Sequence, residues 1–363
     1  MPRELLQHAI RLEFESDTLV HANLSGAAWV RNDLWVAGDE ACGLDRLRRL
    51  DPVGDEKLRF GDPVNFPLAD YLDLPDAHDI EADIEGIDVH GGYLWLVGSH
   101  GLKRRNPKPE RDQATNLKRL ATVSHDGNRY LLARIPLVEK DGVTSLARRT
   151  DDGRIAARLR GDDRHNDLTR ALYKDPHLGA FLDIPGKDNG FDIEGLAVDE
   201  QRVLLGLRGP VLRGWACLLE LNPIEKKGSL RLDDVAASER PYRKHFLRVG
   251  GLGVRDLHWY NGDLYMLAGP TMVLDGAVRV YRWHDAAALL DSADARADAL
   301  LWDEPPELVL ELPHGIGTDR AEALTQVPSG VFTDKPHWLV LYDAPGADRQ
   351  PTPYTVLGDL LRR

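Results

Sequence analysis

The sequence Asp-Ile-Glu-Gly occurs twice in this chain, at 83–86 and at 192–195, and each copy leads into an apolar run. A turn follows the run, and a second apolar run then ends in Gly or Asp. Asn-Gly and Gly-Gly between two apolar runs are typical of β-hairpins, because these turns need positive φ angles. A hairpin that returns with an acid at the same point indicates a repeated structural unit.

Three further stretches have the same order of apolar runs and turns, beginning near residues 24, 254 and 320. Aligned on the motif glutamate, the five stretches have equivalent positions 60, 109, 62 and 66 residues apart. Because 109 is close to twice 55, we expect one more unit between residues 125 and 180, and six units in all. The equivalent positions in this alignment are Ser25, Glu85, Glu194, Asp256 and Glu322.

Further strand-like runs follow the hairpins, which gives about four short strands to each unit. Six such units predict an all-β chain, a six-bladed β-propeller that occupies residues 1–363 as a single domain. A β-sandwich would not explain so long a period. Residues 166–182 and 284–302 have a helical pattern, and we expect them to be short helical insertions. The strand-like runs 8–14 and 354–361 are expected to pair within one blade and close the ring.

Composition excludes several classes of function. The net charge of −13 argues against general nucleic-acid binding, and no apolar run approaches the roughly 20 residues of a membrane span. No phosphate-binding loop or dinucleotide motif is present, so no nucleotide cofactor is expected. The two cysteines are too few for a disulfide framework, and the first residues do not resemble a signal peptide. We therefore expect a cytoplasmic protein without a nucleic-acid or membrane partner.

The repeated acids are the main candidates for function. In a propeller the first strand of every blade lies nearest the axis, and residues two apart on a strand point to the same side. Several carboxylates are therefore expected to meet at one mouth of the central channel, where they repel one another unless a cation neutralises them. Ca²⁺ and Mg²⁺ prefer oxygen ligands of this kind. The ligand-binding acids predicted in this way are Asp83, Glu85, Asp192, Glu194, Asp256 and Glu322, the first four of them as metal ligands. Arg208 and Arg255 complete the predicted ligand-binding residues.

A purely structural role for these acids is the alternative. Each carboxylate could accept backbone N–H bonds or pair with an arginine, and Arg208, Arg255 and Arg320 are available for this. The second hairpin strands also end in polar residues, which would lie near the same face. Of these, Arg208 and His100 are the candidate catalytic groups, since they could stabilise negative charge on a bound anion.

The two Asp-Ile-Glu-Gly motifs, together with "GSHG", "GLRGP" and "GLGVRDLHW", resemble the bacterial domain-of-unknown-function family 3616 over nearly the whole chain. This resemblance implies a β-propeller and no known activity. That family is distantly similar to the esterase-like phytase propellers, which share an Asp-x-Glu-Gly pattern. The second resemblance implies a calcium-assisted phosphomonoesterase with its metal at Asp83, Glu85, Asp192 and Glu194. Ser25 and Asp256 depart from that glutamate pattern.

Two classes of function therefore remain open from the sequence. The first is a propeller that binds a small ligand or a divalent cation at an acidic channel mouth and serves in recognition or as a scaffold. The second is a Ca²⁺- or Mg²⁺-dependent phosphoester hydrolase, in which the ion polarises the phosphoryl oxygen. The sequence does not identify the ligand or a partner protein.

Overall fold

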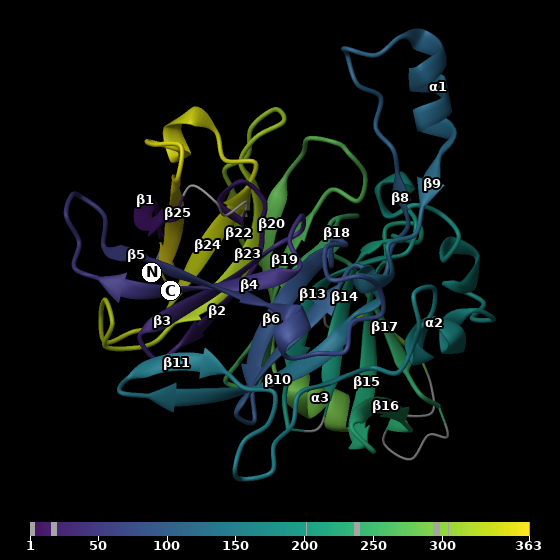
Figure 1. Cartoon of the computed structure of the whole chain (residues 1–363), viewed down its shortest axis with the longest axis horizontal. Helices are drawn as coiled ribbons and strands as arrows, with labels where there is room; N and C mark the ends of the chain where they lie inside the picture. Colours follow the sequence, from purple (N-terminus) through teal and green to yellow (C-terminus); the bar gives the residue numbers. More distant parts are fainter. Residues whose placement is uncertain are drawn as a thin grey trace.

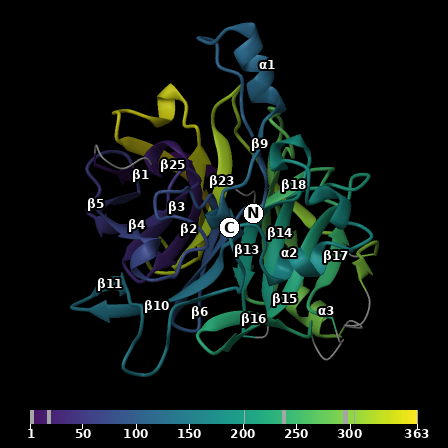
Figure 2. The ribbon, with the colours of Figure 1, turned by 45° about the vertical axis from the view of Figure 1, so that its right-hand side comes forward.

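The computed structural model describes residues 4–15, 20–200, 202–235, 240–292, 298–303 and 305–362. Within these ranges the chain folds into mostly antiparallel sheets whose first strands lie side by side around a common centre (Figures 1 and 2). This arrangement is the β-propeller predicted from the sequence. None of the described helices has the length and the apolar content of a transmembrane span.

The described strands form five blades. Blade 1 consists of β2 (Leu24–Val30), β3 (Asp33–Gly38), β4 (Gly43–Leu50) and β5 (Leu58–Pro67), and blade 2 consists of β6 (Ile84–His90), β7 (Tyr93–Gly98) and β10 (Leu132–Lys140), where β10 also pairs with β11 (Val143–Leu146) and β12 (Ala157–Arg158). Blade 3 consists of β13 (Asp192–Val198), β14 (Val203–Gly209), β15 (Ala216–Lys226) and β17 (Arg243–Leu247), where β15 also pairs with β16 (Ser229–Asp233) and β17 with β21 (Ala299–Leu300). Blade 4 consists of β18 (Gly253–Tyr260), β19 (Asp263–Gly269), β20 (Val278–Trp283) and β22 (Glu307–Leu312), and blade 5 consists of β23 (Arg320–Val327), β24 (His337–Asp343), β25 (Thr355–Arg362) and β1 (Glu4–Glu13).

The innermost strands close a ring. Strand β2 contacts β6, β6 contacts β13, β13 contacts β18, β18 contacts β23, and β23 contacts β2 again. The blades in the described residues are thus one fewer than the six predicted. Residues 125–180, where the sixth was expected, instead supply β10, β11 and β12, and β10 pairs with β7 to extend blade 2.

The pairing of the two ends of the chain is confirmed. Strand β1 runs antiparallel to β25, from Glu4 opposite Arg362 to Glu13 opposite Thr355. It also pairs in parallel with β5, which joins blade 5 to blade 1 in one continuous sheet. The N-terminal strand therefore completes the last blade and covers its outer edge.

A hydrophobic cluster lies between each pair of neighbouring blades, so five clusters hold the ring together. Strand β3 shows why its sequence is apolar without a break. Leu34 and Val36 enter the cluster between blades 5 and 1, whereas Trp35 and Ala37 enter the cluster between blades 1 and 2. Successive side chains of a strand point to opposite faces, and here both faces are buried.

In the described chain, every helix lies in a connection between two strands. The two expected insertions contain α2 (Asp167–Leu172) and α3 (Ala286–Ser292); residues 293–297 of the second lie outside the described residues. A third helix, α1 (Gln113–Ala121), was not predicted. It stands away from the sheets at the tip of an arm whose base is formed by β8 (Lys103–Arg104) and β9 (Val123–Ser124) (Figures 1 and 2).

Candidate ligand-binding site

The inner hairpins share a structural irregularity. In every blade the register between the first and second strands shifts at the same point, so that one residue of the first strand is left without a partner. A β-bulge of this kind re-aims a side chain. The bulged residues, one from each blade in chain order, are Ser25, Glu85, Glu194, Arg255 and Glu322.

This register corrects the sequence alignment in blade 4. The residue equivalent to the motif glutamates is Arg255, and the predicted Asp256 is one position further on, where it pairs with Leu267. The buried Asp256 carboxylate accepts the backbone N–H groups of Leu257 at 2.8 Å and of Leu324 at 2.7 Å. Burial raises its pKa well above the usual range. Asp256 therefore links blade 4 to blade 5 and does not line the channel mouth.

A second set of side chains comes from the ends of the second strands. In each blade, the last residue of the first strand that pairs before the bulge has a partner on the second strand. The residue directly after this partner belongs to the second set, whose members are Asp39, Ser99, Arg208, Gly269 and Asp343. Members of the two sets meet at a cavity of about 140 Å³. Its charged lining residues are Asp39, Glu85, Lys187, Glu194, Arg208, Arg255, Arg320, Glu322 and Asp343.

Two buried arginines join three of the predicted acids into a chain. Arg208 forms ion pairs with Asp192 and, at 2.6 Å, with Glu194. Arg255 forms an ion pair with Glu322 and lies 3.5 Å from the second oxygen of Glu194. Alternating charges thus run through blades 3, 4 and 5. The alternative considered from the sequence was that the acids pair with arginines. These three acids have that arrangement in the structure.

Gly269 provides the room for one of these arginines. A Cβ atom at this position would lie 2.6 Å from Nε of Arg255. The Arg255 guanidinium passes over this glycine and donates to the carbonyl oxygen of Pro270 at 3.1 Å. The glycine at this point of blade 4 thus lets a long cation occupy a place where blades 1 and 5 have an aspartate.

Asp83 is held by an arginine from a distant connecting segment. Arg129, in the short 3₁₀ turn Gly127–Tyr130, forms an ion pair with Asp83 and donates to Ser99 Oγ at 3.1 Å. Burial lowers the Arg129 pKa, but the carboxylates around it, Asp83 foremost, outweigh this and leave it above its ordinary value. No motif marks Arg129, because it comes from the segment that was expected to form a separate blade.

Two acids at the cavity have no such partner. Among the described residues, neither Asp39 nor Glu85 forms an ion pair or a hydrogen bond through its side chain, and the buried Oδ1 of Asp39 is without any acceptor or donor contact. Burial, together with repulsion from Asp83 and Glu194, raises the pKa of Glu85 well above its usual range. Burial, Asp83 and Asp343 raise the pKa of Asp39 to about 8.

Two further acids of the lining also have raised pKa values. Burial outweighs the attraction of Arg208 and raises the pKa of Glu194 to about 7. Burial and the neighbouring Glu322 raise the pKa of Asp343 to about 7. Asp39, Glu194 and Asp343 are therefore partly protonated near neutral pH. Asp39 and Asp343 could have been found from the sequence, since each ends the second apolar run of its hairpin.

His100 lies away from the cavity. Its ring is buried, with Nδ1 2.8 Å from the carbonyl oxygen of Gly98 and Nε2 2.7 Å from the side-chain nitrogen of Asn166. Because the Asn166 amide donates to Nε2, Nδ1 carries the proton and donates to Gly98, and the ring is neutral. Burial agrees with this state, because it lowers the His100 pKa to about 4. The imidazole therefore connects the end of β7 to the N-terminus of α2.

The four predicted metal ligands are divided among different partners. Asp83 faces Arg129, and Asp192 and Glu194 share Arg208. Glu85 and Glu194 both line the cavity, and of the four only Glu85 is without an ion pair among the described residues. In the described part of the chain, no three His, Cys, Asp or Glu side chains are grouped closely enough to hold a metal ion by themselves. A cation at this mouth would thus be held by Glu85 and Asp39, with water or the ligand's own groups completing its contacts.

A family model described as "Protein of unknown function (DUF3616)" matches residues 23–359. No curated protein sequence matches the chain significantly. Solved structures that align with it include the PQQ-bound aldose sugar dehydrogenase of Streptomyces coelicolor (11% identity, 99% of this chain and 98% of that one, TM-score 0.39). Glutaminyl cyclase of Myxococcus xanthus aligns at 10% identity, over 97% of each chain, with a TM-score of 0.39. Arabinanase Arb43A of Bacillus subtilis aligns at 12% identity, over 99% and 94%, with a TM-score of 0.38.

Proposed function

Because the chain belongs to the DUF3616 family of proteins of unknown function, no activity comes to it from its family, and we propose from its own geometry that it is a propeller that binds a small cation at the channel mouth. One observation carries this proposal. Among the described residues, Asp39 and Glu85 line the cavity without forming an ion pair, and Lys187 in the same lining only partly offsets their charge, while the acids behind them are paired with arginines.

The energetics of the mouth favour a cation. Five acids and four basic groups line the cavity, and the repulsion among the acids is relieved at present by protons on those with raised pKa values. A bound cation would replace these protons and stabilise the ionised carboxylates. Binding is therefore coupled to proton release and is stronger above pH 8 than at pH 6.

The size of the cavity limits the ligand. Its volume of about 140 Å³ is below the roughly 300–1,000 Å³ of sites for drug-sized molecules, so it suits a hydrated divalent ion or an organic ammonium of a few atoms. Met272, Val273 and Leu274, which are exposed, form part of the wall and would contact the alkyl part of an organic cation.

Phosphoester hydrolysis, the second function expected from the sequence, receives less support. Arg208 is already paired with two carboxylates, His100 lies elsewhere, and a phosphate in the cavity would meet Asp39 and Glu85. Once they are ionised, these two carboxylates repel an anion.

The test is calorimetric titration of the full chain with CaCl₂, MgCl₂ and ethylammonium chloride, each at pH 6 and pH 8. We expect one of these probes to bind with one-site stoichiometry and to release protons, shown by heats that depend on the ionisation enthalpy of the buffer. Glu85→Gln and Asp39→Asn should each weaken binding at least tenfold, whereas Asp51→Asn, at an exposed acid, should leave it unchanged. The proposal fails if none of the three probes binds, or if both cavity variants bind like the parent.

A further inference from the structure

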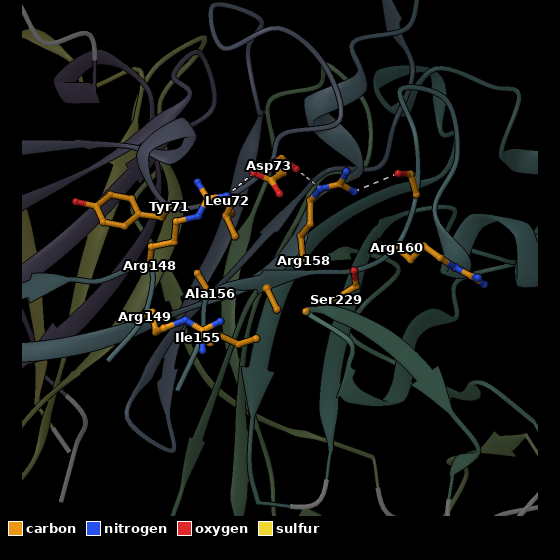
Figure 3. A pocket seen from close by; sticks show the side chains of 13 residues that line it. Tyr71, Leu72, Asp73, Arg148, Arg149, Ile155, Ala156, Arg158, Arg160 and Ser229 are labelled. Carbon is orange, nitrogen blue, oxygen red and sulfur yellow. Dashed lines mark hydrogen bonds and ion pairs between the residues drawn. The ribbon is translucent and has the colours of Figure 1, made fainter. Parts of the chain in front are cut away.

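A second cavity, of about 430 Å³, lies where the outer parts of blades 2 and 3 meet (Figure 3). Its walls come from the segment after the 3₁₀ turn Leu68–Asp70, from the connection between β11 and α2, and from the tip of the β15–β16 hairpin. None of its lining residues belongs to the channel mouth. The parallel bridge between Leu159 and Leu230 fixes the two blades against each other beside it.

The charge of this cavity is opposite to that of the whole chain. Its lining contains one acid, Asp73, and four arginines, although the protein carries a net charge of −13. Arg160 pairs with Asp167 at 2.9 Å and points away from the others in Figure 3. Three guanidinium groups therefore remain for the cavity: Arg148, Arg149 and Arg158.

Arg158 makes the most side-chain hydrogen bonds of the three within the described chain. Its side chain is half-buried and donates to three backbone carbonyl oxygens: that of Asp73, and those of Leu159 and Gly161, each at 3.2 Å. These acceptors are neutral, so they orient the guanidinium without cancelling its charge. Burial lowers the Arg158 pKa, and Asp73 and Asp162 only partly oppose this. A bound anion would supply the missing compensation.

The other two guanidiniums are available. Figure 3 shows Arg148 and Arg158 on either side of Asp73, and Arg148 forms an ion pair with its carboxylate. Both partners of that pair are largely exposed, and such pairs contribute about 0–1 kcal/mol, so a stronger anion can replace Asp73. Within the described chain, Arg149 has neither an ion pair nor a side-chain hydrogen bond, and it lies beside Ile155 in Figure 3.

The remainder of the wall suits a small organic molecule. Leu72 and Ala157 are buried beneath the arginines, and Tyr71 adds a half-buried ring. The volume falls within the roughly 300–1,000 Å³ of small-molecule sites. Guanidinium groups bind phosphate oxygens with paired N–H donors, which is why arginine is preferred at phosphate sites. We infer that this cavity binds a small phosphorylated molecule, whose phosphate groups contact Arg148, Arg149 and Arg158.

The experiment is calorimetric titration of the full chain with inorganic pyrophosphate at pH 7.5 in 0.15 M NaCl. We expect saturable one-site binding that Arg158→Gln weakens at least tenfold and Arg149→Gln severalfold. Asp73→Asn should strengthen binding, because it removes the carboxylate that competes for Arg148. A role of these arginines in stability alone would predict no gain from Asp73→Asn. Arg149→Gln keeps the test valid if Arg158→Gln fails to fold, since the Arg149 side chain forms no ion pair or hydrogen bond with the described residues.

Two controls separate this site from the rest of the surface. Arg160→Gln removes the arginine that points away, and Glu85→Gln alters the channel mouth; neither should change pyrophosphate binding. The inference is overturned if pyrophosphate does not saturate the protein below about 10 mM. It is also overturned if Arg149→Gln binds like the parent, or if Arg160→Gln loses as much affinity as Arg149→Gln.

Discussion

Arg255 and Glu322 occupy the same bulged position in two neighbouring blades, and they form a largely buried ion pair across the boundary between these blades. Arg255 also lies 3.5 Å from Glu194, the bulged residue of the blade on its other side. An acid at position 255 would place three carboxylates in succession around the channel. The arginine in blade 4 therefore allows the acids of blades 3 and 5 to be buried together.

Replacing this arginine should cost far more stability than replacing an arginine on the surface of the same blade. In Arg255→Gln, Glu194 and Glu322 lose their shared cation, and breaking a buried pair costs about 3–5 kcal/mol. The matched control is Arg279→Gln on β20, which removes an exposed pair with Glu311 and should cost about 0–1 kcal/mol. Urea unfolding of the two variants measures the difference. Equal losses would show that the ring of charges has no special part in stability.

The stability of the parent should fall as the pH rises from about 4 to 8. The pKa of Asp39 is about 8 in the folded protein and near its ordinary 3.8 when unfolded, so the folded state binds more protons over this interval. Stability decreases with pH wherever the folded state binds more protons. Asp39→Asn removes this group and should be at least about 1 kcal/mol more stable than the parent at pH 8, with no such gain at pH 4.

Chemical unfolding at pH 4, 6 and 8 gives the slopes of stability against pH. The exposed Asp51→Asn serves as the control and should follow the parent at each pH. A slope for Asp39→Asn equal to that of the parent between pH 6 and 8 would show that Asp39 is not protonated in the folded state.

The repeat predicted the propeller and the closing pair of strands, because hairpins and apolar runs are local signals. The number of blades could not be read in the same way. The gap of 109 residues between Glu85 and Glu194 looks like two units, but it contains one blade with two insertions: the arm that carries α1, and the segment 147–191. Long surface insertions cost little free energy, so the number of blades cannot be deduced reliably from the number of residues between two motifs.

The sequence predicted only part of the site, because the rest depends on how distant segments come together in the fold. The motif acids Glu85, Glu194 and Glu322 come together. In blade 4, however, the alignment placed Asp256 at the equivalent position, whereas the bulged residue is Arg255. A bulge depends on the pairing of two strands and leaves no mark in the order of residues. Arg129 and Lys187 reach the acids from distant connecting segments, so only the folded chain brings them near.

Gly86, which follows the bulged Glu85, lets two inner strands approach closely. A Cβ atom here would lie 2.9 Å from Cβ of Leu196 and 3.1 Å from the carbonyl oxygen of Glu194 on β13. Since part of this contact is backbone, Gly86→Ala should destabilise the protein by about 1–3 kcal/mol. In the control Gly54→Ala, the new methyl meets only the end of the half-buried Glu56 side chain, which can move at the cost of its hydrogen bonds from the backbone N–H groups of Val53 and Gly54. Thermal melts compare the two, and a Gly86→Ala variant as stable as the control would contradict this account.

Asp359 fastens the N-terminal strand to the ring. Its buried carboxylate accepts the backbone N–H of His8 at 2.9 Å, the Tyr342 hydroxyl at 2.6 Å, and two N–H groups of Arg349 at 2.7 and 3.0 Å. His8 has a positive φ of 54°, at the point where the pairing of β1 with β25 shifts register. The carboxylate thus satisfies the N–H group that this irregularity leaves without a partner in the sheet.

Removing this carboxylate should therefore both destabilise the fold and release β1. Asp359→Ala leaves Arg349 and Tyr342 buried without their acceptor, so we expect a loss of about 3–5 kcal/mol. The exposed Asp348→Ala is the matched control and should change stability by less than about 0.5 kcal/mol. Hydrogen exchange supplies the decisive measurement. In Asp359→Ala the amides of β1 should exchange faster than those of β18, whose pairing does not involve Asp359. Equal acceleration in both strands would mean that Asp359 supports the whole propeller and has no particular role in closing the ring.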